Sequence, residues 1–226
     1  MSDRSAAHPV VAVDGPTAAG KTTTSRLIAS RLDLAYLESG RTYRLVAYMA
    51  LQTGLDLYDE HGLIRLCDEI LGNRVPGIEL LMNDTGRVLR QLDVTHAVSL
   101  VARVPGLRSK LTSLTRSWAA GRGKSCIIEG RDIGTTVFPD APVKFYLTAE
   151  PEVRALRRVK QEGGSYEVIL KDVLRRDDAD MTRQDSPLRP AEDAVLIDTT
   201  WLSINQVVEQ MLSRCYEGDL APPQPS

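Results

Sequence analysis

The stretch VVAVDGPTAAGKTTT, residues 10–24, decides the fold class of this chain. Residues 10–14 form a short apolar run that ends in an aspartate, a pattern typical of a strand buried on both faces of a parallel sheet. A glycine-rich turn follows, and from Lys21 the apolar positions recur at helical spacing. The order of strand, loop and helix predicts the first unit of an α/β fold.

The same alternation of strands and helices is predicted further along the chain. Residues 125–128, 143–147 and 194–197 predict more buried strands, each with a helical segment near it. Amphipathic helices are expected over residues 166–174 and 203–212. Alternation of short apolar strands with helices predicts a mostly parallel sheet covered by helices on both faces.

The alternation of strands and helices is interrupted between residues 63 and 105, where we expect a small insert. A short helix is predicted over residues 63–71, followed by a stretch of alternating character over residues 75–82 and a polar turn at residues 83–86. The pattern favours a hairpin in this insert.

The composition of the chain argues against several classes of function. The 226 residues carry a formal net charge of −2, so nothing indicates binding to a nucleic acid polymer. Three widely spaced cysteines without a CxxC pair argue against a disulfide framework or a zinc site, as expected in the reducing cytoplasm. The first nine residues do not resemble a signal peptide, and no apolar run reaches the ~18 residues of a membrane span.

The segment GPTAAGKT, residues 15–22, fits the pattern G-x-x-x-x-G-K-[ST] of a phosphate-binding loop. Its two glycines let the backbone curl so that several N–H groups point at one phosphate, and the following helix adds its positive N-terminus. Lys21 can bridge β- and γ-phosphate oxygens, and the Thr22 hydroxyl can bind Mg²⁺. The residues predicted to bind ATP or GTP are Gly15, Pro16, Thr17, Ala18, Ala19, Gly20, Lys21, Thr22 and Thr23. This loop alone fixes neither the acceptor nor the choice between a kinase and a hydrolase.

Three further segments narrow that choice: LESGRTYR at residues 37–44, EGRDIGT at 129–135 and RDDADMTR at 176–183. In that order they resemble the signature segments of bacterial cytidylate kinases, and the resemblance runs from residue 10 to about residue 212. It implies a kinase that moves the γ-phosphoryl group of ATP onto CMP or dCMP, with Mg²⁺ as the cofactor.

The resemblance also implies roles for individual residues. Those that match holders of the acceptor phosphate are Ser39, Arg44 and Arg131. Those that match readers of the cytosine edge are Ser99, Arg108, Asp132 and Arg183. Arg176 and Asp180 match residues that hold the ribose hydroxyls, although their spacing also fits a solvated helical ion pair. Arg157, with Arg154 and Arg158 beside it, resembles the basic cluster of a lid that closes over ATP.

The resemblance further implies how the chain is divided. We expect one domain with a core at residues 9–62 and 106–215, a nucleoside monophosphate (NMP) binding insert at 63–105, a lid at 151–186 and a disordered tail at 218–226. Catalysis would rest on Lys21, Arg131 and Arg157, without a general base, because phosphoryl transfer needs mainly positioning and charge neutralisation. A monomer is expected, since no exposed apolar heptad is evident.

Alternatives stay open. Glu38 and Arg41 replace the aspartate and alanine usual in the family, and Ala179 stands where a basic residue is frequent. The acceptor could therefore be UMP or a modified pyrimidine monophosphate. A regulatory module that binds nucleotide without turnover is a second rival. A GTPase ranks last, because no guanine-reading NKxD-like segment is present.

Overall fold

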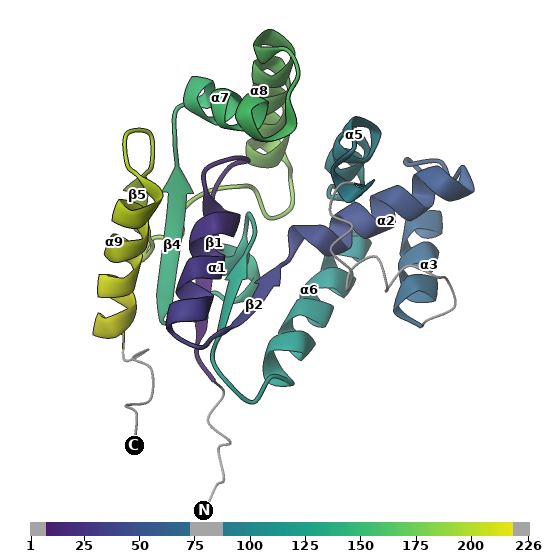
Figure 1. Cartoon of the computed structure of the whole chain (residues 1–226). Helices are drawn as coiled ribbons and strands as arrows, with labels where there is room; N and C mark the ends of the chain where they lie inside the picture. Colours follow the sequence, from purple (N-terminus) through teal and green to yellow (C-terminus); the bar gives the residue numbers. More distant parts are fainter. Residues whose placement is uncertain (1–7, 73–87, 219–226) are drawn as a thin grey trace, which may run out of the picture. The chain divides into compact units, whose positions relative to one another are not determined.

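A computed structural model describes residues 8–72 and 88–218 of the chain (Figure 1). The predicted hairpin at residues 75–82 and the polar turn at 83–86 lie outside the described residues, as do residues 219–226 of the predicted tail. The chain divides into two compact units, residues 1–38 with 116–226 and residues 39–115.

The first unit is built on a five-stranded sheet in which every pair of neighbouring strands is parallel. Its order is β2-β3-β1-β4-β5. The strands are β1 (Val10–Asp14), β2 (Ala35–Glu38), β3 (Cys126–Glu129), β4 (Val143–Thr148) and β5 (Val195–Asp198). The central strand β1 is buried along its whole length, which explains its continuous apolar sequence. The predicted α/β fold with a parallel sheet is confirmed.

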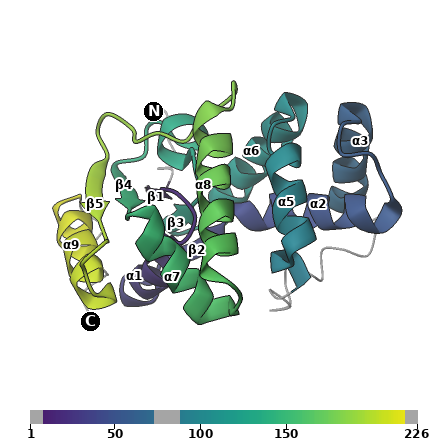
Figure 2. The same ribbon diagram turned by 90° about the horizontal axis from the view of Figure 1, so that it is seen from above.

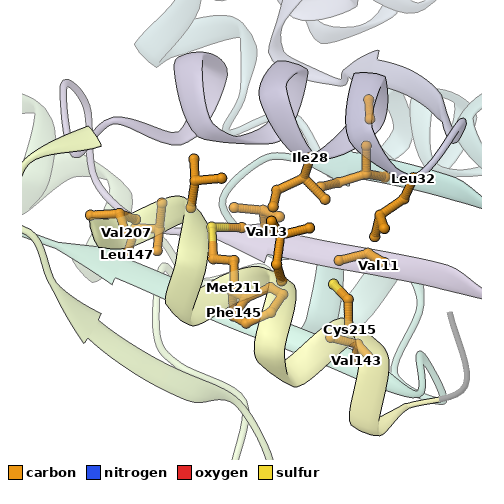
Figure 3. Close-up of a cluster of buried hydrophobic side chains, with 14 of the residues drawn as sticks. Val11, Val13, Ile28, Leu32, Val143, Phe145, Leu147, Val207, Met211 and Cys215 are labelled. Carbon is orange, nitrogen blue, oxygen red and sulfur yellow. The ribbon is translucent and has the colours of Figure 1, made fainter. Parts of the chain in front are cut away.

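Helices cover both faces of this sheet. On one face α1 (Lys21–Arg31) and α9 (Ile204–Glu217) pack on side chains that include Val13 and Phe145 (Figure 3). On the other face the last residues of α6 (Pro105–Ala120) and the short turn η2 (Ile133–Val137) pack against Ala12. The layers predicted from the strand and helix rhythm are therefore present.

Two helices, α7 (Pro151–Glu162) and α8 (Tyr166–Thr182), lie side by side, as Figure 2 shows from above. They share a small apolar cluster of Ala155, Ile169 and Val173. Gly163 and Gly164 join them with φ angles of 75° and 97°, which glycine adopts without strain. These helices contain most of the residues predicted as a lid.

The second unit is helical and has its own apolar core. It contains α2 (Gly40–Thr53), α3 (Glu60–Leu71), η1 (Val88–Arg90), α5 (Leu92–Val101) and most of α6. The predicted insert at residues 63–105 falls wholly within this unit. In the described part of the chain, no helix is long and apolar enough to cross a membrane.

Burial predicts which aromatic side chains stabilise the first unit. Replacing Phe145, which is 1% exposed, with alanine should cost about 3–5 kcal/mol, because the protein loses the burial of the ring and retains a cavity. Trp201 is 84% exposed, so Trp201→Ala should change stability by no more than about 0.5 kcal/mol. Urea denaturation followed by circular dichroism compares the two, and equal losses would contradict the assigned core.

Candidate functional site

The glycine-rich loop between β1 and α1 has a backbone that only certain residues can adopt. Gly15 has a φ of +143°, and a Cβ atom there would lie 2.0 Å from the carbonyl oxygen of Leu147. Gly20 and Ala18 also have positive φ values, 96° and 58°. The loop therefore curls as a phosphate-binding loop must, with glycine required at its first position.

Lys21 begins α1 and is buried. Its ammonium group donates a 2.6 Å hydrogen bond to the carbonyl oxygen of Pro16, inside the loop. Burial and then the nearby Arg131 lower the pKa of Lys21, while Glu129 and Asp14 oppose that shift. Burial makes the charged form of Lys21 costly. A polyphosphate bound in the loop would place negative charge beside Lys21 and reduce this cost, so the site favours an anionic ligand.

Asp14, the last residue of β1, joins this loop to the segment that follows β3. Its carboxylate accepts hydrogen bonds from the backbone N–H groups of Ile133 (2.8 Å) and Gly134 (2.7 Å). Burial raises the pKa of Asp14 to about 6, although these two donors counteract the shift. The residues next to Asp132 are thus fixed relative to the start of the loop.

Glu129 is a site residue to which the sequence analysis gave no role. It ends β3, is 3% exposed, and its carboxylate accepts a 2.5 Å hydrogen bond from the Tyr36 hydroxyl. Burial raises the pKa of Glu129, while the nearby Lys21 and the hydroxyls of Tyr36 and Thr22 oppose that shift. One signal in the sequence could have identified Glu129. It is an acidic residue at the end of a buried strand, and such a residue lies at the carboxyl edge of a parallel sheet, where ligands bind.

Five residues predicted on the acceptor side come together in the first unit. Arg131 donates through Nε to Asp180 at 2.9 Å, and Arg183 lies 3.7 Å from Asp180 and 3.9 Å from Asp132. Burial raises the pKa of Asp180, but Arg131, Arg176 and Arg183 together hold it below its usual value. Of the three guanidinium groups and two carboxylates in this cluster, those of Asp132, Arg176 and Arg183 are buried and those of Arg131 and Asp180 are half-buried. Arg176 and Asp180 are therefore not a solvated ion pair.

The other acceptor-side residues lie in the second unit. Ser39 precedes α2 and is buried, and its carbonyl oxygen accepts a hydrogen bond from Thr42. Arg44 donates to the carbonyl oxygen of Leu89 at 2.9 Å and to the Thr95 hydroxyl at 3.2 Å. The Arg44 guanidinium is thus held in place by backbone and side chain within its own unit.

Ser99 and Arg108 were predicted to read the cytosine edge. Ser99 lies half-buried on α5. Arg108 is 3% exposed, donates to the carbonyl oxygen of Ala102 at 3.2 Å and lies over the ring of Tyr43, 5.7 Å from its centroid. A charged side chain so buried is typical of a functional position or an essential structural one.

The three arginines predicted for the lid have different surroundings. Arg154 is buried and forms a bidentate pair with Asp177, and it also donates to the carbonyl oxygen of Thr17 at 3.2 Å. Arg158 is buried against Asp172 at 2.7 Å. Both pairs join α7 to α8, so these two arginines stabilise the helix pair.

Arg157 differs because it is bound to neutral groups. It donates to the hydroxyl and carbonyl oxygens of Thr199 at 3.0 and 2.6 Å, and the Thr199 hydroxyl donates in turn to the carbonyl oxygen of Ala19 in the loop. Burial lowers the pKa of Arg157. Without an acidic ion-pair partner among the described residues, Arg157 keeps its charge available beside the loop.

The parallel sheet, the curled loop and the buried lysine define a P-loop nucleotide-binding protein. The family model for cytidylate kinase matches residues 11–217. The chain therefore belongs to the cytidylate kinase family, which confirms the resemblance and makes this protein an ATP-dependent phosphotransferase of the nucleoside monophosphate kinase class.

Individual relatives agree with this assignment, and a solved structure shares the fold. The chain is 44% identical over 213 residues to a cytidylate kinase of Rhodococcus jostii (strain RHA1), covering 90% of this chain and 93% of the relative. It is 42% identical to a cytidylate kinase of Carboxydothermus hydrogenoformans, covering 89% and 95%. A sugar kinase from Janibacter sp. HTCC2649 shares the fold with a TM-score of 0.51 at 20% identity, over 96% of this chain and 99% of that one.

The close approach of Gly15 to β4 predicts a graded effect of alanine in the loop. Gly20→Ala meets open space and should lose only about 1 kcal/mol from its left-handed backbone. Gly15→Ala must also displace the Leu147 carbonyl, so it should lower the melting temperature considerably more. Differential scanning calorimetry of both variants tests this, and the reverse order would contradict the loop geometry.

The buried pair of Arg154 and Asp177 predicts non-additive stability. Asp177→Ala leaves a buried guanidinium without its carboxylate and should cost about 3–5 kcal/mol. The double variant Arg154→Met with Asp177→Leu removes both charges and should lose much less. Chemical denaturation of the single and double variants measures the coupling, and additive losses would show that the pair is not structural.

Proposed function

We propose that this protein transfers the γ-phosphoryl group of ATP to the phosphate of CMP or dCMP. The observation that carries the proposal is the largely buried cluster of Arg131, Asp132, Arg176, Asp180 and Arg183 in the unit that contains the phosphate-binding loop. The relatives named cytidylate kinase support the choice of cytosine.

The donor site follows from the loop. Lys21 and the loop N–H groups would bind the β- and γ-phosphates, and Arg157 would approach them from beside Ala19. The residues present fit Mg²⁺, because this ion takes one or two protein oxygens and completes its shell with phosphate and water. Thr22 would hold the ion, with Glu129 behind it, and Mg²⁺ would neutralise charge that develops on the transferring group.

The acceptor side uses charge complementarity. Arg131 is already oriented by Asp180 and by the carbonyl oxygen of Gly130, so its remaining N–H groups can donate to the acceptor phosphate. Asp132 can accept from the exocyclic amine of cytosine, and Arg183 can donate to the ring acceptors. Uracil carries a carbonyl in place of that amine, so it offers the Asp132 carboxylate no donor of its own.

The remaining assignments complete the proposal. Ser39 and Arg44 would bind the acceptor phosphate, Ser99 and Arg108 the cytosine, and Arg176 with Asp180 the ribose. Residues 151–186 would act as the lid and residues 63–105 as the NMP-binding insert. The protein would work as a monomer in the cytoplasm, where its three buried, free cysteines stay reduced.

One observation favours a second candidate, a modified pyrimidine monophosphate as the acceptor. A terminal guanidinium nitrogen of Arg41, at the start of α2, is buried and has no hydrogen-bond partner within the described residues. Such a donor is costly to leave unsatisfied, so an acceptor with an additional oxygen would stabilise it.

An assay of ADP release with CMP, dCMP, UMP, dUMP, AMP and GMP tests the proposal. We expect CMP or dCMP to lead by kcat/KM, and UMP to fall by about 10-fold or more because a buried carboxylate loses its donor. Arg41→Ala should leave the order for unmodified acceptors unchanged. If all six acceptors are inert while ATP binds, the cytosine assignment is wrong.

A further inference from the structure

The hydroxyl of Tyr36 reaches a site residue on the neighbouring strand. In the register of β2 against β3, Tyr36 lies opposite Ile127 and Glu38 opposite Glu129. Ile127 and Glu129 point to the same face of the sheet, because side chains two apart on a strand do so. Tyr36 therefore meets Glu129 diagonally across the pair, at 2.5 Å from hydroxyl to Oε1.

The Tyr36 ring is fixed before its hydroxyl makes this bond. It is half-buried against the apolar cluster beneath α1, and the guanidinium of Arg26 in α1 lies over it, 5.4 Å from the ring centroid. These contacts restrict rotation of the ring, so packing helps to set the direction in which the hydroxyl points. The fixed hydroxyl in turn restricts where the Glu129 carboxylate can lie.

Glu129 also lies beside the start of the loop, because β3 pairs with β1 and Glu129 lies opposite Val13. Burial raises the pKa of Glu129, but the charge of Lys21 and the hydroxyl of Thr22 oppose that shift, so both groups stabilise its ionised form. An ionised carboxylate only accepts, so Tyr36 donates to it, and a Thr22 hydroxyl that bonds to it would donate as well. A threonine hydroxyl has a single proton and two lone pairs, and once the proton points at Glu129 the lone pairs are left for a cation.

We propose that Tyr36 is a positioning residue of the donor site, which holds Glu129 so that the Thr22 hydroxyl presents its oxygen to the Mg²⁺ of bound Mg·ATP. This inference rests on the proposed function, in which Thr22 holds that ion. Partners behind a metal ligand orient it and increase its basicity, and their loss typically weakens metal affinity by 10- to 100-fold. Tyr36 would act without touching the nucleotide or the ion.

The test separates the contribution of the metal from that of the nucleotide. Calorimetry measures binding of a non-hydrolysable ATP analogue to the full chain, once with saturating Mg²⁺ and once with EDTA. The ratio of the two affinities is the magnesium-dependent gain. Tyr36→Phe keeps the ring and its packing, so we expect affinity in EDTA and the melting temperature to match the wild type while the gain falls by about 10-fold.

A matched control and a double variant make the result specific. Tyr216→Phe removes a hydroxyl from an exposed tyrosine of α9 and should leave the gain unchanged. Glu129→Gln should lower the gain by itself, and Tyr36→Phe should then add little to it, because Tyr36 acts through Glu129. Should Tyr36→Phe fail to fold, Glu129→Gln still tests the inference, because a normal gain in that variant removes the residue through which Tyr36 would act.

Three results would overturn the inference. An unchanged gain in Tyr36→Phe, equal losses with Mg²⁺ and with EDTA, or additive effects of the two substitutions would each reduce Tyr36 to a packing residue. A normal gain in Glu129→Gln would do the same. A wild-type protein with no magnesium-dependent gain would instead remove the proposed ion from Thr22, which is a failure of the proposed function.

Discussion

The Asp14 carboxylate makes the interaction on which the rest of the first unit depends. It accepts from the backbone of Ile133 and Gly134, and so ties the end of β1 to the segment that carries Arg131 and Asp132. Burial raises its pKa from 3.8 to about 6, so ionising it costs folding stability as the pH rises through that range. The two N–H donors reduce this cost, and the site obtains a fixed spacing between donor loop and acceptor cluster.

The other charged groups withdrawn from solvent in the first unit follow the same principle as Asp14: each has a partner that offsets the cost of its burial. Arg154 with Asp177, Arg158 with Asp172 and Arg131 with Asp180 are each paired, because an unpaired buried charge is far more costly than a paired one. Pairing with a carboxylate also determines which arginines are available to a ligand. The first two arginines hold α7 on α8, whereas the hydrogen bonds of Arg157 within residues 8–72 and 88–218 go to the neutral oxygens of Thr199, so its charge remains available to an anion.

Elements whose bounds depend on local sequence signals were predicted correctly, whereas elements whose bounds depend on packing were displaced or missed. The predicted bounds of β1 and the start of α1 are confirmed, because an apolar run and a glycine-rich loop carry their own signals. The strand predicted at residues 194–197 was displaced by one residue, and α8 extends well beyond the predicted residue 174. The half-buried edge strand β2 and the helices α2, α5 and α6 were not predicted. The N-cap residue of α5 is Gln91, which is not a preferred capping residue, and Ser39 before α2 makes no side-chain cap hydrogen bond, so the start signals of both helices are weak.

The same distinction explains the candidate site. Lys21 and Thr22 follow from a motif, and Arg131 with Asp180 from a family resemblance, but the bond between Tyr36 and Glu129 depends on β2 lying next to β3. Sequence order places these strands far apart, and nothing in either segment states which strands are neighbours. Once the parallel sheet brings the two strands together, a tyrosine that would otherwise be assigned to packing becomes the partner of a buried carboxylate. Residues that act through another residue are therefore the ones that a motif cannot identify, because their role is defined by the register of the sheet.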